Sequence, residues 1–193
     1  MRAFVVYESM YGNTHAVADH VADGLRSCFD VTESSVSDVT ADLISAADLL
    51  VVGGPTHAHG LSTRSTRGAA ADAAKKDPSL SLEPVSPTQP GLRDWLRSIP
   101  DGQRGPIAAF DTRLRAPAAF TGRASVGIAR RLRRRGFQVV AKPESFFVDK
   151  HNLLLDGEAK RAETWGAGLA RSFNATGDAA IGSAVSRTID PLA

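Results

Sequence analysis

Residues 8–14 read Glu8-Ser9-Met10-Tyr11-Gly12-Asn13-Thr14, directly after a short apolar run and directly before a segment with helical periodicity. An apolar run that ends in small hydroxyl, amide and glycine residues indicates a buried strand that delivers the chain to the start of a helix. The first turn of a helix leaves backbone N–H groups unpaired and carries the positive end of the helix dipole, which favours a bound phosphate. Ser9, Asn13 and Thr14 would add side-chain hydrogen bonds, and Gly12 would let the backbone approach the ligand closely. The stretch therefore predicts a phosphate-binding turn.

The rest of the chain alternates between strand-like and helix-like segments. Apolar, β-branched runs predict strands at residues 2–7, 29–36, 48–54, 106–110 and 137–141. Apolar residues spaced three and four apart predict helices at residues 13–27, 41–47, 90–99, 122–135 and 157–173. This alternation is typical of a doubly wound α/β fold with right-handed crossovers, and we expect a five-stranded parallel sheet.

Three segments fall outside this alternation. Residues 144–149 are expected to extend or follow the fifth strand. Residues 77–90 hold several prolines and serines without apolar periodicity, which predicts a mobile surface loop. Residues 174–193 show no clear pattern and are expected to form a C-terminal tail, so we place a single domain at residues 1–173.

Composition limits the classes of function. With 193 residues and 42% hydrophobic content, the chain fits one medium-sized domain. The formal net charge of +2 gives no reason to expect binding to nucleic acid or to an anionic membrane. The only cysteine, Cys28, excludes an internal disulfide. No stretch approaches the roughly 20 apolar residues of a transmembrane helix, so we expect a soluble, cytoplasmic protein.

The ligand site is expected at one edge of the sheet. In an open parallel sheet, ligands bind beyond the carboxyl ends of the strands, where the strand order reverses. The candidate binding residues after the first, third and fourth strands are Ser9 to Thr14 (Ser9, Met10, Tyr11, Gly12, Asn13, Thr14), Pro55-Thr56-His57-Ala58-His59-Gly60, and Asp111-Thr112-Arg113.

The first of these loops resembles the phosphate loop with which the flavodoxin family binds flavin mononucleotide (FMN). Residues 9–14 are particularly similar to flavodoxin domains of the flavodiiron type, although Tyr11 departs from the Ser/Thr-x-Thr-Gly-x-Thr form of short flavodoxins. Residues 53–57, Gly-Gly-Pro-Thr-His, resemble a segment of flavodoxin-like proteins and quinone reductase relatives. The resemblance covers most of residues 1–173 and implies the strand order 2-1-3-4-5. It also implies that the first loop holds the phosphate of FMN, while the second and third loops flank the isoalloxazine ring.

The ring-flanking loops depart from the family in their aromatic content. Electron-transfer flavodoxins commonly hold the ring between Trp or Tyr side chains, whereas these loops offer His57 and His59 and no large aromatic residue. We hypothesise that one face of the ring is open to a small substrate, which favours hydride exchange. Arg113 and Arg115 would stabilise a reduced, anionic flavin.

His57 and His59 are the candidate catalytic residues. A histidine can donate a hydrogen bond or deliver a proton near neutral pH because its unperturbed pKa is about 6.5. The plainer alternative is a pair of polar loop residues with no chemical role. We expect no metal site, because no nearby Cys, Asp or Glu completes a set of ligands with this pair.

Two segments rich in arginine leave alternatives open. Residues 62–67, Ser-Thr-Arg-Ser-Thr-Arg, could bind an anionic substrate or the phosphate of a nicotinamide cofactor, or could simply form a capped, solvated helix start. Residues 130–135 carry five arginines, which suits a solvated helix face or a docking patch for an acidic protein. No recognition motif or aromatic platform accompanies them, so nucleic-acid binding is not expected.

The leading interpretation is an FMN-binding, flavodoxin-like oxidoreductase or electron-transfer protein. Its partner would be a redox protein or a small quinone-like substrate, and the sequence leaves a homo-oligomer open. NAD(P)H would act only as a transient reductant, because the chain has no Gly-x-Gly-x-x-Gly motif. The main alternative is a cofactor-free binding or interaction module with the same fold. A phosphosugar or nucleotide enzyme ranks last, because no nucleophile or general-base pair is identifiable.

Overall fold

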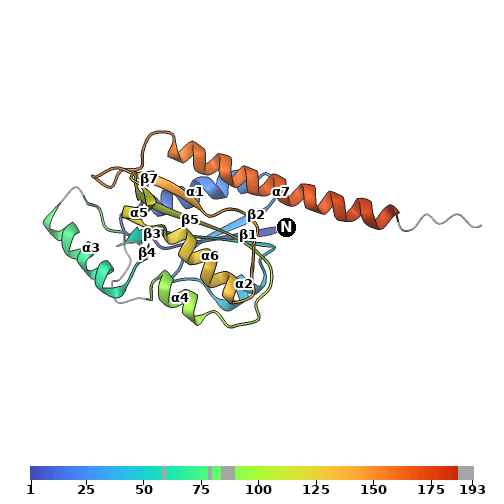
Figure 1. The fold of residues 1–193 in the computed structure, drawn as a ribbon, viewed down its shortest axis with the longest axis horizontal. Helices are drawn as coiled ribbons and strands as arrows, with labels where there is room; N and C mark the ends of the chain where they lie inside the picture. Colours follow the sequence, from blue (N-terminus) through green and yellow to red (C-terminus); the bar gives the residue numbers. More distant parts are fainter. Residues whose placement is uncertain (58–59, 78–79, 84–89, 187–193) are drawn as a thin grey trace, which may run out of the picture.

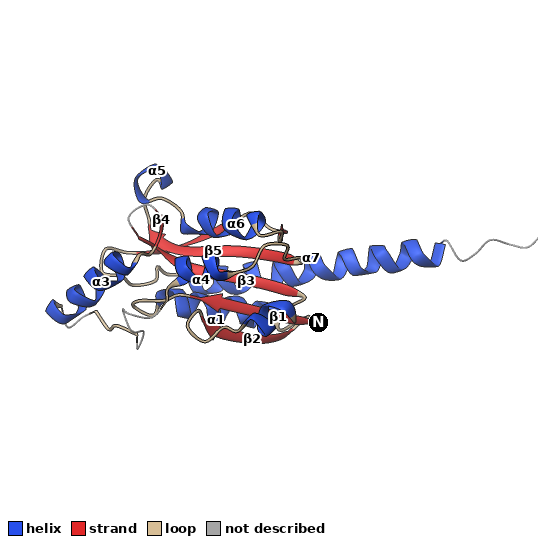
Figure 2. Cartoon of the chain, turned by 90° about the horizontal axis from the view of Figure 1, so that it is seen from below, coloured by secondary structure: helices blue, strands red, loops and turns tan. Residues whose placement is uncertain are grey.

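The centre of the fold is a parallel sheet, shown in Figures 1 and 2. The computed structural model describes residues 1–57, 60–77, 80–83 and 90–186. The strands of the main path are β1 (Arg2–Tyr7), β2 (Asp30–Ser35), β3 (Leu49–His57), β5 (Pro106–Leu114) and β6 (Gln138–Val139). They lie in the order β2-β1-β3-β5-β6. Two further strands, β4 (Gly60–Leu61) and β7 (Glu144–Val148), pair with β3 and β5 respectively. The doubly wound α/β fold and the predicted strand order are confirmed.

The fifth strand of the prediction is divided into two parts. Strand β6 pairs with Pro106 and Ile107 at the start of β5, and β7 pairs in parallel with residues 110–114 at its end. Pro143 lies between the two parts and has no backbone N–H to donate to a sheet ladder. Residues 144–148 therefore extend the fifth strand, as the sequence predicted.

Helices cover both faces of the sheet. One face packs against α1 (Asn13–Leu25) and α7 (Glu158–Ser186), and the other packs against α2 (Ala41–Ser45), α4 (Leu92–Ser98) and α6 (Ala124–Arg134) (Figure 1). Adjacent residues of each central strand point to opposite faces, so the strands are apolar throughout. The first core contains Val5, Val51, Phe110, Val17 and Leu169, and the second contains Val6, Val52, Ala109, Leu92 and Ile128.

Strands β3 and β5 are longer than predicted. Residues 55–57 and 111–113 were expected to be loops, but they continue the two strands. The reason is that short partners pair with these ends. Strand β4 pairs antiparallel with Thr56 and His57, and β7 pairs with the end of β5.

Three helical regions differ from the prediction. Helix α3 (Arg64–Lys76) was predicted only as an alternative, a capped helix start at residues 62–67, and α5 (Ala118–Thr121) was not predicted; both lie at the carboxyl end of the strands (Figure 1). Helix α7 continues past the predicted end at residue 173 to Ser186, so residues 174–186 are helical and not a tail without pattern. This part of the helix projects beyond the sheet (Figure 2), where no apolar stripe is needed for packing.

In the part of the chain that the structure describes, no helix combines the length and the apolar character needed to cross a membrane.

Candidate functional site

A cavity of about 440 Å³ opens at the carboxyl ends of β1, β3 and β5. All three predicted loops contribute side chains to it. The predicted residues that line the cavity are Ser9, Met10, Tyr11, Asn13, Thr14, Pro55, Thr56, His57, Thr112 and Arg113. The sequence therefore predicted the place of the cavity and most of its lining.

The loop between β1 and α1 has the geometry of an anion-binding turn. Gly12 is the N-cap residue of α1 and has φ = 85°, a conformation that favours glycine. Its N–H donates a hydrogen bond to Ser9 Oγ at 3.2 Å, which closes the turn. As the N-cap residue, Gly12 has no side chain that could cap α1. The backbone N–H groups of the first turn are therefore available to a ligand.

Side-chain hydrogen bonds hold this loop against its neighbours. The hydroxyl oxygens of Thr14 and Thr112 are 2.7 Å apart, which joins the loop directly to the end of β5. Asn13 Nδ2 donates to the Asn152 carbonyl at 2.7 Å. Tyr11 donates its hydroxyl hydrogen to the carbonyl of Ala70 in α3 at 2.9 Å. The cavity is therefore preorganised by contacts from three sides.

The end of β3 presents Thr56 and His57. Thr56 Oγ1 accepts a hydrogen bond from the Ala124 N–H at the start of α6, at 2.9 Å. Burial lowers the pKa of His57 below its usual 6.5; Glu8 opposes this shift and Arg67 adds to it. His57 Nε2 is buried, and no hydrogen-bond partner for it lies among the described residues. His57 thus lines the cavity and carries a buried ring nitrogen without a hydrogen-bond partner among the described residues.

Arg113 lines the cavity, but other groups of the protein already hold its guanidinium. Arg113 Nη1 donates to the Ala116 carbonyl at 2.7 Å and to Thr121 Oγ1 at 2.9 Å. The guanidinium also lies over the ring of Phe147, 4.8 Å from its centroid. Arg113 therefore fixes the turn after β5 and places a positive charge beside the cavity. Arg115 is not among the lining residues.

The remaining predicted residues lie elsewhere. Asp111 is fully buried and does not line the cavity; its Oδ2 accepts the Ser125 N–H of α6 at 2.7 Å. This hydrogen bond holds the Asp111 carboxylate at the start of α6, whereas the next two residues of β5, Thr112 and Arg113, line the cavity. Gly60 belongs to β4 and is not a lining residue. Ala58 and His59 lie outside the described residues.

Residues 62–67 form the capped start of α3. Thr63 Oγ1 accepts the Thr66 N–H at 3.1 Å, and Thr66 Oγ1 accepts the Thr63 N–H at 2.8 Å. This reciprocal pair is a capping box. Ser62 is only 1% exposed and Arg67 only 2%, so neither can reach a ligand in solvent. The capped helix start is confirmed; Ser62 and Arg67 are buried behind it, whereas Thr66 lines the cavity.

Sequence reasoning missed five lining residues, namely Ala69, Ala70, Leu114, Val148 and Asn152, while Thr66 belongs to the segment at residues 62–67 that was considered for an anionic ligand. The capping pattern and alanine-rich run at residues 63–74 could have indicated α3, but apolar periodicity is weak there. Asn152 follows β7, whose carboxyl end lies at the same edge as those of the other parallel strands. The rule that located the first three loops applies equally to this fourth one.

The segment at residues 80–83 contacts the loop before α1. The Glu83 N–H donates to the Met10 carbonyl at 2.9 Å, and Glu83 Oε1 lies 2.7 Å from His15 Nδ1. Residues 78–79 and 84–89 of the predicted mobile loop lie outside the described residues. Within the described ranges, no group of three or more His, Cys, Asp or Glu side chains could hold a metal ion.

Residues 5–89 match the family model for flavodoxin, and this range contains both the turn before α1 and the end of β3. This chain is flavodoxin-like. No curated protein sequence matches it.

Solved structures support the flavodoxin-like fold over most of the chain. A flavodoxin from the domain Archaea is 22% identical, with a TM-score of 0.59, and the match covers 89% of this chain and 98% of that one. Flavodoxin 1 from Bacillus cereus is 17% identical, with a TM-score of 0.59 and coverage of 86% and 95%. The flavodiiron protein from Giardia intestinalis is 20% identical, with a TM-score of 0.55 and coverage of 88% of this chain and 35% of that one. At these identities the likeness is one of fold.

Proposed function

We propose that this flavodoxin-like chain binds FMN in the cavity and works as an oxidoreductase or electron-transfer protein. The observation that carries the proposal is the convergence of the β1–α1 turn, the end of β3 and the end of β5 around one cavity of about 440 Å³. That volume lies within the range of about 300–1,000 Å³ found for small-molecule sites.

The residues present fit such a ligand in two places. The turn at residues 9–14 and the first-turn amides of α1 would hold a phosphate, because Gly12 provides the required backbone conformation. His57 Nε2, a buried ring nitrogen that lacks a partner among the described residues, would pair with a polar edge of the flavin ring. When bound, FMN would supply the capacity to accept and release electrons.

The chain's own groups would orient the ligand and set its electrostatic surroundings. His57 is expected to be neutral near pH 7, since its burial lowers its pKa. It can therefore donate or accept one hydrogen bond without carrying a charge. Arg113 would place a fixed positive charge beside the ring and favour a negatively charged ligand.

For reactants, we propose either a redox partner protein or a small quinone-like substrate. The cavity wall supports access by a small molecule, because Tyr11 is the only Trp, Tyr or Phe among its lining residues in the described chain. NAD(P)H is proposed only as a transient reductant at the exposed face of the flavin.

A visible absorption spectrum tests the proposal. Purified protein is mixed with FMN, excess flavin is removed, and the spectrum is recorded before and after anaerobic addition of NADPH, NADH or a quinol. We expect a retained flavin spectrum that bleaches on reduction and returns when an oxidant is added. Failure to retain flavin from a saturating solution would contradict the proposal.

One observation favours the second candidate, a cofactor-free interaction module. The Asn13 amide and the Thr14 hydroxyl, which would bind a phosphate, are already paired with Asn152 and Thr112. The same spectrum separates the two candidates, because only a cofactor-free module would show no flavin absorption after the excess FMN is removed.

A further inference from the structure

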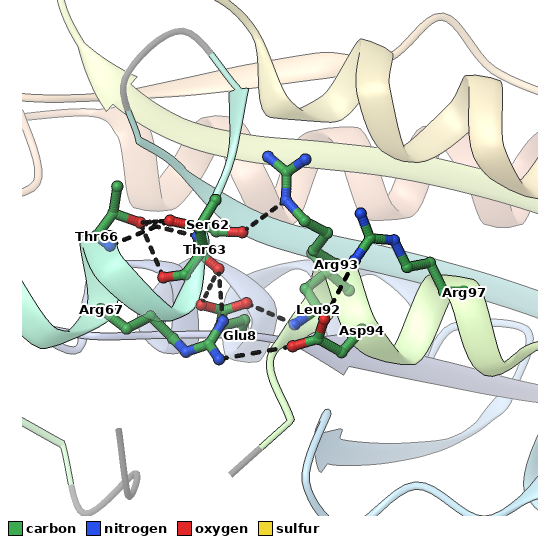
Figure 3. Close-up of polar contacts among 9 residues, drawn as sticks. All are labelled: Glu8, Ser62, Thr63, Thr66, Arg67, Leu92, Arg93, Asp94 and Arg97. Atoms are coloured by element: carbon green, nitrogen blue, oxygen red, sulfur yellow. Dashed lines mark hydrogen bonds and ion pairs between the residues drawn. The ribbon is translucent and has the colours of Figure 1, made fainter. Parts of the chain in front are cut away.

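Two opposite charges are buried directly behind the cavity wall. Glu8 and Arg67 are each only 2% exposed. Figure 3 shows both side chains in one cluster of polar contacts. Glu8 directly precedes Ser9 in the turn before α1, and Arg67 directly follows Thr66 in α3. Ser9 and Thr66 both line the cavity. Each buried charge is therefore one residue away from a side chain that faces the ligand site.

A small hydrogen-bond network joins the two charges. Glu8 Oε1 accepts the hydroxyl of Ser62 at 2.5 Å, and Glu8 Oε2 accepts the N–H of Leu92 at 2.6 Å. Arg67 Nη1 donates to the same Ser62 hydroxyl at 3.4 Å, and Arg67 Nη2 lies 3.7 Å from Asp94 Oδ2. The network thus connects the end of β1 with the N-terminal ends of α3 and α4.

Gly91 packs directly against this network. A Cβ atom at this glycine would lie 2.0 Å from Arg67 Nη1 and 3.1 Å from Glu8 Oε2. Both charged groups therefore lie against the same point of the backbone. The missing side chain of Gly91 is what leaves room for them.

Stability does not account for this arrangement. Arg67 lies in the first turn of α3, where the helix dipole disfavours a positive charge. Burying two opposite charges also removes the hydration of both, and an apolar pair of similar size is often as stable. A role in the neighbouring ligand site is the stronger explanation.

We propose that Arg67 is a positioning residue for an anionic ligand. It offsets the buried charge of Glu8, so that the adjacent turn accepts the phosphate of FMN. This inference rests on the proposed function. It adds a reason why the site would select FMN, the phosphorylated flavin, over riboflavin. Without Arg67, the Glu8 carboxylate would repel a phosphate through partly desolvated protein, where charges interact more strongly than in water.

The charges of Glu8 and Arg67 also act on a side chain of the cavity wall. His57, on the cavity wall, responds to both charges: Glu8 raises its pKa and Arg67 lowers it, although burial has the larger effect. Asp94, the ion-pair partner of Arg67, is 46% exposed and also pairs with Arg97, so solvent screens its charge. The other charged groups at this end are engaged elsewhere, with Glu83 against His15 and Arg113 over Phe147. Glu8 and Arg67 are therefore the two charges whose balance a substitution can alter with a clear expected sign.

The test compares the affinities for FMN and for riboflavin, which lacks the phosphate. The proteins are the wild type, Arg67→Gln, Glu8→Gln and the double variant. Arg67→Gln should weaken FMN binding by about tenfold and riboflavin binding by less than about threefold. Glu8→Gln should leave FMN binding unchanged or strengthen it. The double variant should recover the wild-type ratio of the two affinities, because the uncompensated charge is gone.

Equal losses for both flavins in the Arg67→Gln and Glu8→Gln variants would overturn the inference, since a purely structural role predicts that result. If Arg67→Gln does not fold, Glu8→Gln alone decides, because a weaker FMN affinity relative to riboflavin contradicts the proposed sign. Arg67→Lys, which keeps the charge, should retain the wild-type ratio of affinities; a ratio shifted against FMN would contradict the inference.

A second readout needs no flavin. NMR titration of His57 should show a higher pKa in Arg67→Gln and a lower pKa in Glu8→Gln, and an unchanged pKa in both would overturn the inference. A wild-type protein that binds riboflavin but not FMN would also overturn it. Binding of neither flavin would instead contradict the proposed function, and the titration would still report whether the pair sets the potential of the cavity.

Discussion

At the scale of single residues, the proposed phosphate site depends on Gly12 in the turn before α1. Its φ of 85° is costly for a residue with a side chain. A Cβ atom there would meet only Glu83 Oε1, at 4.0 Å, so the penalty is backbone strain and not a clash. We predict that Gly12→Val weakens FMN binding at least about tenfold while the fold persists, measured by quenching of flavin fluorescence and by circular dichroism.

The control for this variant is Gly102→Val. Gly102 also has a positive φ, 80°, and open space around its Cβ position, but it lies outside the turn at residues 9–14. It should lose about 1–3 kcal/mol of stability and keep its affinity for FMN. If Gly12→Val bound FMN with the affinity of the wild type, the turn before α1 would not be part of the binding site.

Asp111 should make stability depend on pH. Burial raises its pKa above the usual 3.8, although its hydrogen bond from the Ser125 N–H opposes the shift. Between the unfolded and folded pKa values, the folded protein holds a proton that the unfolded chain has released, so the free energy of unfolding falls as pH rises. Relative to Asp111→Asn, the wild type should lose about 1.4 kcal/mol for each unit by which the pKa is raised.

Urea unfolding of both proteins at several pH values from 4 to 7 measures this difference. If the free energy of unfolding changed with pH in the same way in the wild type and in Asp111→Asn, the folded protein would not raise the pKa of this carboxyl.

At the scale of elements, α1 and α7 approach so closely that a methyl group does not fit between them. A Cβ atom at Gly166 would lie 2.2 Å from the Val21 carbonyl oxygen, and one at Gly24 would lie 2.1 Å from the Glu163 carbonyl oxygen. We predict that Gly166→Ala lowers the free energy of unfolding by about 1–3 kcal/mol, because the helices must separate.

Gly168→Ala is the matched control in the same helix. Its Cβ would meet only Arg171 Nη2, at 3.9 Å, so stability should stay the same or rise by up to about 1 kcal/mol through helix propensity. Equal stability changes in the two variants, measured by urea unfolding, would contradict this close packing of the helices.

The elements differ in how well their sequences predicted them. The central strands are apolar on both faces, and this pattern predicted β1, β3 and β5 directly. Their lengths depended on β4 and β7, whose pairing is a tertiary contact that local sequence does not encode. Only the start of helix α3 was anticipated, as one of two alternatives, because the helix lies mostly outside the core, where helices need no apolar periodicity.

At the scale of the whole molecule, the site is predictable because the strand ends gather at one edge. Residues 9–14, 55–57 and 112–113 are distant in sequence, yet the rule for open parallel sheets placed them together. The same rule could not say which way each side chain points, and Asp111 therefore differed from the prediction. It also could not reveal the Glu8 and Arg67 pair, since burial of two charges depends on how α3 and α4 meet.

Ligand binding should stabilise the whole domain. A ligand at a hundred times its dissociation constant raises the free energy of unfolding by about 2.7 kcal/mol when it binds only the folded state. We predict that FMN raises the midpoint of thermal unfolding in the wild type and produces a much smaller shift in Gly12→Val. Scanning calorimetry measures both shifts, and identical shifts in the two proteins would place FMN somewhere other than the turn before α1.

An NMR titration of the ¹⁵N-labelled protein with FMN tests the central claim most directly. We predict the largest changes at the backbone amides of residues 9–14, with further changes at Thr56, His57 and Thr112, which line the same cavity. Riboflavin should perturb the ends of β3 and β5 and leave the amides of residues 9–14 less affected. A spectrum that FMN leaves unchanged, or changes confined to residues away from the cavity, would contradict the account.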